Sequence, residues 1–310
     1  MANSSSSLRA NPSVSVIIPV YNDSKRLAIC LRALENQTYP QNLYEVIVVD
    51  NGSNDNLESH IHQFPQAIFI KEDQPGSYAA RNKGISVATG EVIAFTDSDC
   101  IPNSDWVERG LSTLQSVPNC GLIAGRISLR FRNPEKPTAV EIYESLNAFK
   151  QKNMVEKYQH GATANLFTFK SVLDQVGIFN DSLKSGGDVE WGKRVYAHGY
   201  NQAYAEEACV AHPARYSLGE LYRKVTRVTG GIHDMEDPNS FSFFAISEDL
   251  IKLTIFLLAL LRRAFFGMPP FDNLNGHKQG LQYISVVAFV GLVKIRERIR
   301  LQSGHKPRRQ

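Results

Sequence analysis

The sequence predicts an α/β protein built on a mostly parallel β-sheet flanked by helices, and three observations support this fold class. Segments typical of strands and of helices alternate four times within about the first hundred residues. Residues 92–95 form a short uncharged run, Val-Ile-Ala-Phe, of the kind that is buried on both faces of a parallel sheet. Polar residues follow the ends of four strands, as they do at the ligand-binding edge of open α/β sheets.

The expected strands are short and rich in β-branched residues, and the expected helices carry apolar residues three or four apart. The strands cover residues 14–18, 46–50, 68–70, 92–95, 121–129, 162–169 and 202–211. The helices cover residues 23–37, 77–89, 104–116, 140–157, 171–176 and 188–198. Pro19 is expected to stop the first strand, Asp23 or Ser24 to cap the first helix, and Gly90 to cap the end of the second.

Composition indicates a globular protein, because 43% of the 310 residues are hydrophobic and 21% are charged. The four cysteines are scattered without CxxC spacing, which argues against a zinc cluster or a disulfide framework and predicts reduced thiols in a cytosolic protein. The serine-rich start lacks the charged and apolar regions of a signal peptide, so residues 1–12 are expected to be a disordered leader.

Charge is distributed unevenly along the chain. Residues 294–310 hold seven Lys or Arg and one Glu, a net +6, which leaves −3 for the rest of a chain whose net charge is +3. A basic tail on a slightly acidic body predicts an anionic surface as partner. Nucleic acid is not expected as a partner, because the tail lacks interleaved aromatic residues.

Two carboxylates separated by one serine, Asp97 and Asp99, follow the buried run at residues 92–95. Residues two apart on an extended chain point the same way, so the pair would suit a hard divalent cation and the phosphate that it carries. An ordinary surface turn would use the same residue types, and the triplet alone does not decide between the two.

Neighbouring strand ends add to this interpretation, because they converge on one edge of a parallel sheet. Tyr21 offers an aromatic face for a nucleobase, and Asp50 can accept a hydrogen bond from a base. Arg81, near the start of its helix, suits a diphosphate by charge and by the helix dipole.

Five motifs occur in order: SVIIPVYN, EVIVVDNGSND, GSYAARNKG, AFTDSDC and SGGDVEW. Together they resemble glycosyltransferase family 2 over about residues 14–215. The resemblance implies the GT-A fold, a nucleotide-sugar donor, a divalent metal (Mg²⁺ or Mn²⁺) and inversion at the anomeric carbon. UDP is the commonest carrier in that family, with GDP and TDP as alternatives.

The resemblance also implies roles for individual residues. The donor nucleotide would be bound by Pro19, Tyr21, Asn22, Asp50 and Gly52. Arg81 would lie by the diphosphate, Asp97 would hold the ribose and Asp99 the metal. His212 matches a histidine that often adds a metal or diphosphate contact.

Asp188 matches the general base, the second position of a Glu-Asp pair in that family. The first position is Gly187 here, so a neighbouring carboxylate is missing. The chemistry requires such a base, since a sugar hydroxyl is a poor nucleophile and a carboxylate must take its proton during attack. A cation would neutralise the negative charge that builds up on the departing nucleotide diphosphate.

Several other polar or aromatic residues have simpler interpretations. Glu190 and Arg194 are at helical spacing, and a structural ion pair or a wall of the acceptor site is favoured over a catalytic role. Trp191 suits the core or an acceptor-stacking platform equally, and Asn165 suits either a plain strand or a contact with the sugar. Structural or solvated roles are expected for four histidines: His60, His62, His198 and His233.

Two apolar stretches close the chain, residues 250–261 and 281–293, each followed by basic residues. Both are shorter than the roughly 20 residues that span a bilayer. Helices that lie in the membrane interface are favoured, and a helical subdomain packed on the core or in a dimer is the alternative. The expected organisation is therefore a catalytic domain at 13–235, with a nucleotide-binding half at 13–100 and an acceptor half at 101–235, and a helical region at 236–310.

The sequence thus predicts a metal-dependent glycosyltransferase, peripheral on the inner face of the cell membrane through residues 249–310. Its acceptor would be a glycan or a lipid-linked glycan, in the synthesis of a polysaccharide, a glycolipid or an envelope glycan. A nucleotidyltransferase is an alternative, although no Gly-rich, Lys-bearing phosphate loop opens the chain. A non-catalytic nucleotide-sugar-binding subunit is another.

Overall fold

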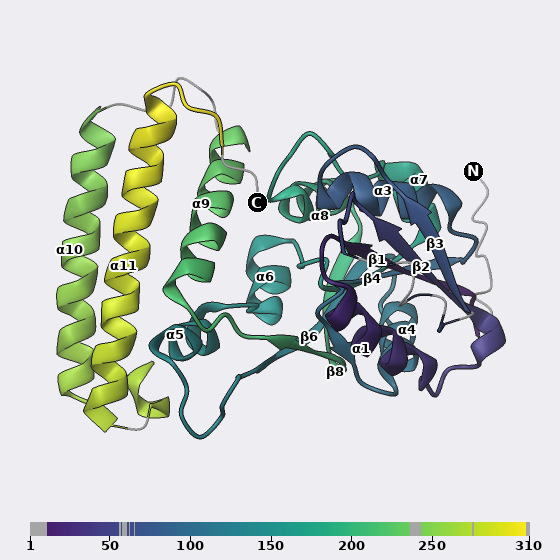
Figure 1. Ribbon diagram of the computed structural model, residues 1–310, viewed down its shortest axis with the longest axis horizontal. Helices are drawn as coiled ribbons and strands as arrows, with labels where there is room; N and C mark the ends of the chain where they lie inside the picture. Colours follow the sequence, from purple (N-terminus) through teal and green to yellow (C-terminus); the bar gives the residue numbers. More distant parts are fainter. Residues whose placement is uncertain are drawn as a thin grey trace. The chain divides into compact units, whose positions relative to one another are not determined.

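The computed structural model describes residues 11–55, 57, 61, 63–64, 66–235, 243–274 and 276–307, and the chain forms two compact units (Figure 1). The first unit comprises the chain up to Ser128 together with Phe149–Ser182 and Gly187–His212. The second comprises Leu129–Ala148, Leu183–Gly186 and the chain from Pro213 onward. Most of the expected leader, residues 1–10, lies outside the described residues.

One eight-stranded sheet organises the first unit, in the order β3-β2-β1-β4-β7-β6-β8-β5. Its strands are β1 (Val14–Val20), β2 (Tyr44–Asp50), β3 (Ala67–Lys71), β4 (Val92–Thr96), β5 (Ile101–Pro102), β6 (Cys120–Arg130), β7 (Asn165–Phe169) and β8 (Asn201–Pro213). The pairs β1–β2, β2–β3 and β1–β4 are parallel. The pairs β4–β7, β6–β7 and β5–β8 are antiparallel, so the parallel part is confined to the first half of the unit.

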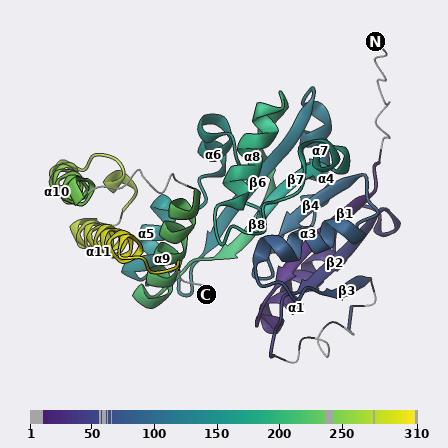
Figure 2. The ribbon, with the colours of Figure 1, turned by 90° about the horizontal axis from the view of Figure 1, so that it is seen from above.

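Helices cover both faces of this sheet (Figures 1 and 2). They are α1 (Ser24–Glu35), α3 (Ser77–Val87), α4 (Trp106–Ser116), α6 (Gln151–Tyr158), α7 (Lys170–Val176) and α8 (Gly187–Ala197), with a short 3₁₀ turn at Gln41–Leu43. On one face, Val16 and Ile18 of β1 share a hydrophobic core with residues of α1 and α4. On the other face, Ile17 and Ile47 share a second core with residues of α3, α7 and α8. Alternate residues of β1 thus enter two hydrophobic cores, as the two-residue period of a strand requires.

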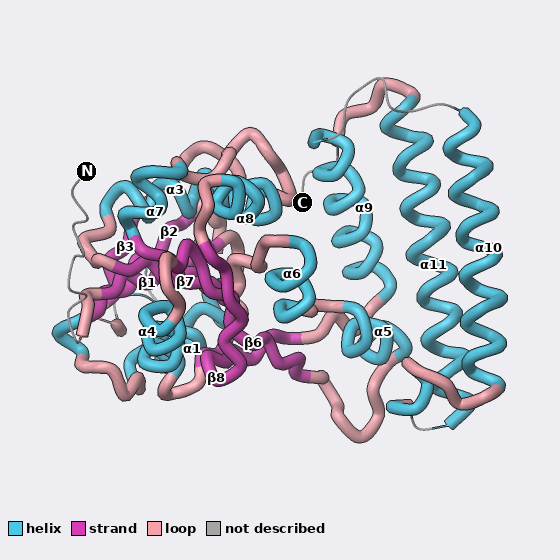
Figure 3. Tube along the Cα trace, turned by 180° about the vertical axis from the view of Figure 1, so that it is seen from behind, coloured by secondary structure: helices cyan, strands magenta, loops and turns pink. Residues whose placement is uncertain are grey.

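Long helices make up most of the second unit, where α10 and α11 lie side by side (Figure 3). The helices are α5 (Ala139–Asn147), α9 (Leu218–Met235), α10 (Phe243–Phe265) and α11 (Gly276–Gln302), with a 3₁₀ turn at Phe271–Asn273. Glu144 is fully buried and pairs with Lys224 at 2.8 Å and with Arg215 at 3.0 Å. Burial alone would raise the pKa of Glu144, but these two cations lower it, so the buried acid is charged and paired.

Pro19 does not stop the first strand, because β1 continues to Val20. Beyond Ile17 the strand no longer pairs with β4, and a strand with one partner accepts a residue that lacks an N–H. Gly90 is not the cap of α3, which ends at Val87 with Ala88 as its cap residue. A Cβ at Gly90 would lie 2.5 Å from the backbone nitrogen of Ser15, so the glycine serves close packing against β1.

The helix expected at residues 140–157 is two helices, α5 and α6. They separate at Phe149, whose φ of 48° lies in the left-handed region and interrupts the helical path. The strand expected at 162–169 begins only at Asn165, because the Asn165 N–H bonds to the Ala162 carbonyl and closes a turn.

Across the described ranges of the chain, none of the helices combines the length and the apolar character needed to cross a bilayer. The two apolar stretches near the end of the chain lie within α10 and α11.

Candidate active site

The ends of β1 and β2 are tied together by short polar contacts. The Asp50 carboxylate accepts the Ser53 N–H at 2.9 Å, and the Ser53 hydroxyl accepts the Asn22 N–H at 2.9 Å. Asn22, at φ 51°, accepts the Asn54 N–H at 2.7 Å. Gly52 provides the φ of 86° that this turn requires. The structure therefore brings together the loop after β1 and the turn after β2, as the sequence predicts.

Two further residues expected to bind the nucleotide lie beside this turn. Pro19 lies within β1, opposite Val49 of β2. Tyr21 follows β1 and is 54% exposed, so its ring is available to stack on a planar group.

Asn51 connects the turn after β2 to the start of α3. Its amide nitrogen donates to the carbonyls of Glu72 and Gln74 at 2.9 and 2.8 Å. Its amide oxygen accepts the N–H of Gly76, the residue before α3, at 2.7 Å. One side chain therefore fixes the loop that leads into α3.

The first turns of α3 carry a buried arginine that forms an ion pair. The Arg81 guanidinium, whose side chain is only 5% exposed, lies 2.5 Å from the Asp97 carboxylate at the end of β4. It also donates to the Ser77 carbonyl at 3.2 Å. Its Nε is buried without a partner among the described residues. Arg81 and Asp97 therefore lie together, and one buried donor of Arg81 is unused.

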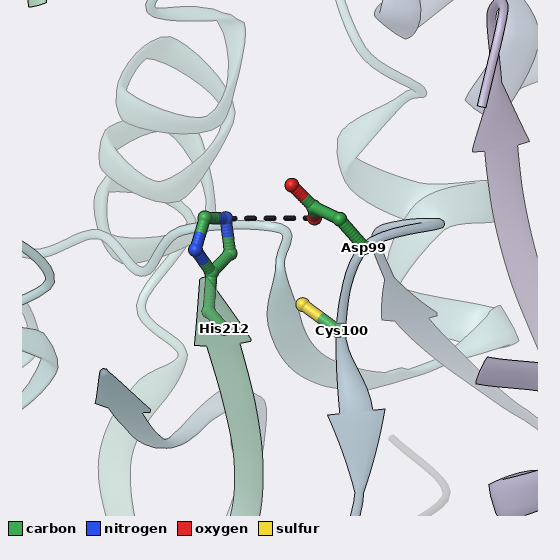
Figure 4. Close-up of side chains that lie close together, drawn as sticks. All are labelled: Asp99, Cys100 and His212. Atoms are coloured by element: carbon green, nitrogen blue, oxygen red, sulfur yellow. Dashed lines mark ion pairs between the residues drawn. The ribbon is translucent and has the colours of Figure 1, made fainter. Parts of the chain in front are cut away.

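Asp99, Cys100 and His212 form a compact group, shown in Figure 4. His212, near the end of β8, directs Nε2 toward the Asp99 carboxylate at 3.5 Å. The ring of Phe149, at the break between α5 and α6, packs on the His212 ring with centroids 4.6 Å apart. Asp99 and His212 are thus brought together as predicted, from positions far apart in the sequence.

The Asp99 carboxyl is largely withdrawn from water. Burial raises its pKa, the His212 ring opposes this shift, and the charge of Asp97 adds to it. Arg26 of α1 reaches Asp99 only at 3.5 Å. Burial also raises the pKa of Cys100 well above its usual range, and the charges of Asp97 and Asp99 raise it further.

Asp188 lies in the first turn of α8 and is partly exposed. Its Oδ1 accepts the Tyr78 hydroxyl at 3.1 Å and the backbone N–H of Val189 at 3.0 Å. Tyr78 precedes Arg81 by one turn of α3, and the Arg81 guanidinium lies 5.7 Å from the Tyr78 ring centroid. The start of α3 therefore contacts Asp97 through Arg81 and Asp188 through Tyr78.

Other residues considered in the sequence have structural roles. Trp191 is fully buried and donates to the Gly177 carbonyl, so it belongs to the core. Glu190 and Arg194 form the expected ion pair at 2.8 Å. Asn165 is fully buried and bonds to Trp106 and to the Ala208 carbonyl, which makes it a strand residue of the core.

Two of the four other histidines considered in the sequence lie in the described part of the chain. His198 is exposed at the end of α8, and His233 lies on α9 in the second unit. His60 and His62 lie outside the described residues.

Sequence reasoning missed four contributors to this region: Asn51, Tyr78, Cys100 and Phe149. Tyr78 carried a usable signal, because it precedes Arg81 by one helical turn within the same motif. Phe149 carried none, since nothing in the sequence near it indicates a helix break.

The comparisons with known proteins agree with this geometry. The model of glycosyl transferase family 2 matches residues 15–177, more than half of the chain. The chain belongs to this family. It is 43% identical over 225 residues to the glycosyltransferase AglE of Haloferax volcanii, a match that covers 71% of this chain and 73% of AglE.

Two further comparisons are more limited. The chain is 37% identical over 118 residues to a chondroitin synthase of Escherichia coli, covering 36% of this chain and 17% of that protein. It resembles the solved structure of the mannosyltransferase PcManGT of Pyrobaculum calidifontis with a TM-score of 0.57 and 15% identity. That match covers 96% of this chain and 76% of PcManGT, and at this identity it speaks for the fold alone.

Family membership makes this chain a glycosyltransferase with the expected GT-A fold. Family membership therefore argues against the two alternatives that the sequence left open, a nucleotidyltransferase and a non-catalytic binding subunit.

We expect Asn51→Ala to loosen the loop before α3. The substitution removes three hydrogen bonds and should destabilise the first unit by about 1–3 kcal/mol. Backbone amides of residues 72–80 should exchange faster with solvent. Both tryptophans, Trp106 and Trp191, lie in this unit, so their fluorescence reports its unfolding in denaturant. Asn54→Ala is the control, since that exposed side chain makes none of these bonds. Equal exchange in the two variants would contradict this role for Asn51.

Proposed function

We propose that this protein transfers a sugar from a nucleotide-sugar donor to a hydroxyl group, with inversion and with help from a divalent cation. The observation that carries the proposal is the pair of contacts made by the start of α3. Tyr78 and Arg81, one turn apart, bond to Asp188 and Asp97, acids from distant parts of the chain. An acid next to the donor and an acid able to take a proton are the two groups that this reaction needs.

The donor set of Asp99 and His212 fits a divalent cation. Two ligand atoms that share one cation, each at about 2.1 Å, lie at most about 4 Å apart. The separation of 3.5 Å between Asp99 Oδ1 and His212 Nε2 meets this limit. A cation bound here would neutralise charge on the donor diphosphate. PcManGT was solved in complex with GDP-Man and Mn²⁺, which supports a nucleotide-sugar and a divalent metal for this chain as well.

The nucleoside is proposed to lie against the loops after β1 and β2. Tyr21 would stack on the base, and Asp50, with Asn22, Gly52 and Pro19 around it, would accept from a base N–H. Asp97 would hold the ribose. Arg81 would lie by the diphosphate, and its buried, unpartnered Nε is a donor that a phosphate oxygen could satisfy. UDP is the carrier we expect first.

Asp188 is proposed to act as the general base. Its carboxylate would take the proton of the acceptor hydroxyl as the hydroxyl oxygen attacks the anomeric carbon. The bond from that carbon to the diphosphate oxygen breaks as the new bond forms, and the electron pair leaves with the nucleotide. One displacement from the face opposite the leaving group inverts the configuration.

The acceptor is proposed to be a lipid-linked or membrane-delivered glycan, because the second unit has an apolar outer face. Four residues spaced along one side of α10 are each 59% exposed or more: Ile251, Ile255, Leu258 and Phe265. Arg262 and Arg263 lie on the same helix, and the segment from 294 onward is basic. An apolar helical face flanked by cations suits the interface of an anionic membrane, at about 1 kcal/mol per cation near the surface.

A groove of about 530 Å³ in the same unit supports a lipid-bearing acceptor. Its walls come from α5, α9, α10 and α11 and are largely apolar, with Ile232, Phe256 and Val287 among them. Lys252, Lys294 and Arg298 also line it, together with Asp249, which pairs with Arg298. An apolar groove with cations along it suits a hydrocarbon chain that ends in a phosphate. Peripheral attachment to the inner face of the membrane is proposed on these grounds, and the four free thiols suit a reducing compartment.

We expect the donor to stabilise the protein only in the presence of a divalent cation. At a concentration of about 100 times its Kd, a bound donor should raise the Tm by about 5–10 °C. The measurement is a thermal-shift screen of UDP-, GDP- and TDP-sugars with Mg²⁺ or Mn²⁺ and with EDTA. Asp99→Asn should lose most of the metal-dependent rise. Equal stabilisation in EDTA would contradict the metal part of the proposal.

We expect Asp188→Asn to keep donor binding and to lower the rate of transfer by about 10²–10⁴-fold, because the amide cannot accept the acceptor proton. Donor binding is measured by the same thermal shift, and transfer by release of the nucleotide diphosphate with an acceptor. Asp174→Asn, an exposed acid on α7, is the control and should transfer normally. Transfer at the wild-type rate by Asp188→Asn would refute this assignment.

We expect the protein to sediment with vesicles of mixed phosphatidylglycerol and phosphatidylcholine at about 150 mM salt, and less with phosphatidylcholine alone. Ile255→Glu with Leu258→Glu should weaken sedimentation at least about tenfold, because two charges would enter the apolar boundary. Ile29→Glu changes an exposed isoleucine of α1 and is the control. Absence of sedimentation by the unmodified protein would rule out the membrane surface as a partner.

A further inference from the structure

Gly187, which begins α8 and precedes Asp188, has no room for a side chain. A Cβ at this position would lie 2.8–2.9 Å from three ring atoms of Tyr78. Such distances are shorter than any normal contact, and the Tyr78 ring is not a flexible end that can move aside. The space beside the proposed base, where the family resemblance implies a second carboxylate, is therefore occupied by the Tyr78 ring.

The same ring ends in a hydroxyl that contacts the proposed base. Tyr78 donates to Asp188 Oδ1 at 3.1 Å, and the backbone N–H of Val189 donates to the same oxygen at 3.0 Å. No residue within the described part of the chain donates to Oδ2. The two oxygens of one carboxylate are thus distinguished: Oδ1 is held by the protein, and Oδ2 is left to accept a proton.

Tyr78 remains a donor because its hydroxyl keeps its proton. Burial raises the pKa of Tyr78 above its usual range, and the charge of Asp188 raises it further. The hydrogen bond therefore runs from tyrosine to carboxylate, and the carboxylate keeps its capacity to act as a base.

The tyrosine ring is itself fixed by aromatic packing. Its centroid lies 5.7 Å from that of Phe179, which packs on Phe95 at 5.3 Å and on Trp191 at 5.2 Å. Phe95 belongs to β4 and Trp191 to α8, so the cluster joins the strand that leads to Asp97 and Asp99 with the helix that carries Asp188. A ring held in this way can position the group that its hydroxyl contacts.

We propose that Tyr78 is the positioning residue for the general base: its hydroxyl holds Oδ1 of Asp188 so that Oδ2 faces the acceptor, and its ring requires glycine at position 187. The inference rests on the proposed function, because it takes Asp188 to be the base. It concerns orientation alone, since Tyr78 exchanges no proton with the substrate.

Tyr78→Phe tests the hydroxyl without removing the ring. We expect kcat to fall about tenfold or more, as loss of a hydrogen bond to a charged group implies, while the donor KM stays within about twofold. The matched control is Tyr44→Phe, which removes another buried tyrosine hydroxyl, bonded to the Leu34 carbonyl at 2.7 Å. Both variants should lower the Tm by similar amounts, but only Tyr78→Phe should lower kcat.

Gly187→Ala tests the ring. Alone, it should lower kcat about tenfold or more, because the added methyl displaces the ring and its hydroxyl. In a Tyr78→Ala background, Gly187→Ala should cause no further loss of kcat, since the atoms it would meet are gone. Equal losses in both backgrounds would contradict the part of the proposal that concerns the ring.

The outcomes separate this inference from the proposed function. Loss of transfer in Asp188→Asn together with wild-type kcat in Tyr78→Phe would overturn the positioning role and leave Asp188 as the base. Full transfer by Asp188→Asn would overturn the proposed base and the positioning role with it. A fall in kcat for Tyr78→Phe that is matched by Tyr44→Phe would show that stability, and not orientation, is at work.

Discussion

The buried guanidinium of Arg81 is the constraint on which the rest of the site depends. Arginine does not lose its proton in a protein, so a side chain that is 5% exposed needs a carboxylate partner. Asp97 supplies it at 2.5 Å, and removal of Asp97 would leave the buried guanidinium without its partner, at a cost of about 3–5 kcal/mol. The pair therefore fixes the start of α3 against the end of β4, which in turn fixes Tyr78.

Aromatic packing extends this constraint to the second half of the first unit. Phe95 of β4 and Trp191 of α8 both contact Phe179, which follows α7. Trp191 is fully buried, and Arg194 on the same helix donates to the carbonyls of Val176 and Ile178. Close packing of these rings and the hydrogen bonds of Arg194 hold α8 in place. Asp188, at the start of α8, therefore has a defined position relative to α3.

The sequence predicted the parts of this arrangement that depend on local pattern. Strand-like runs, helical spacing and polar strand ends located Tyr21, Asp50, Asp97 and Asp99 at one edge of the sheet, because parallel strands all end at the same edge. It could not predict contacts set by tertiary packing. The close approach of Gly90 to β1 and the contact between Tyr78 and Gly187 each depend on a neighbour distant in the sequence. The φ of 48° at Phe149 has no signal in the residues around it. The roles of the site residues remain predictions.

The two acids of the Asp97-Ser98-Asp99 triplet have different electrostatic surroundings, although only Ser98 separates them in the sequence. The charge of Asp97 is matched by Arg81 at 2.5 Å. Asp99 lies 3.5 Å from Arg26 and from His212, which are looser contacts, and burial raises its pKa. A cation stabilises a carboxylate most when the carboxylate is buried and its charge is incompletely matched. Loss of water disfavours the charged carboxylate, but it also strengthens the attraction of that charge to a divalent ion. Asp97 is thus the acid that is closely paired within the protein, and the charge of Asp99 is less completely matched.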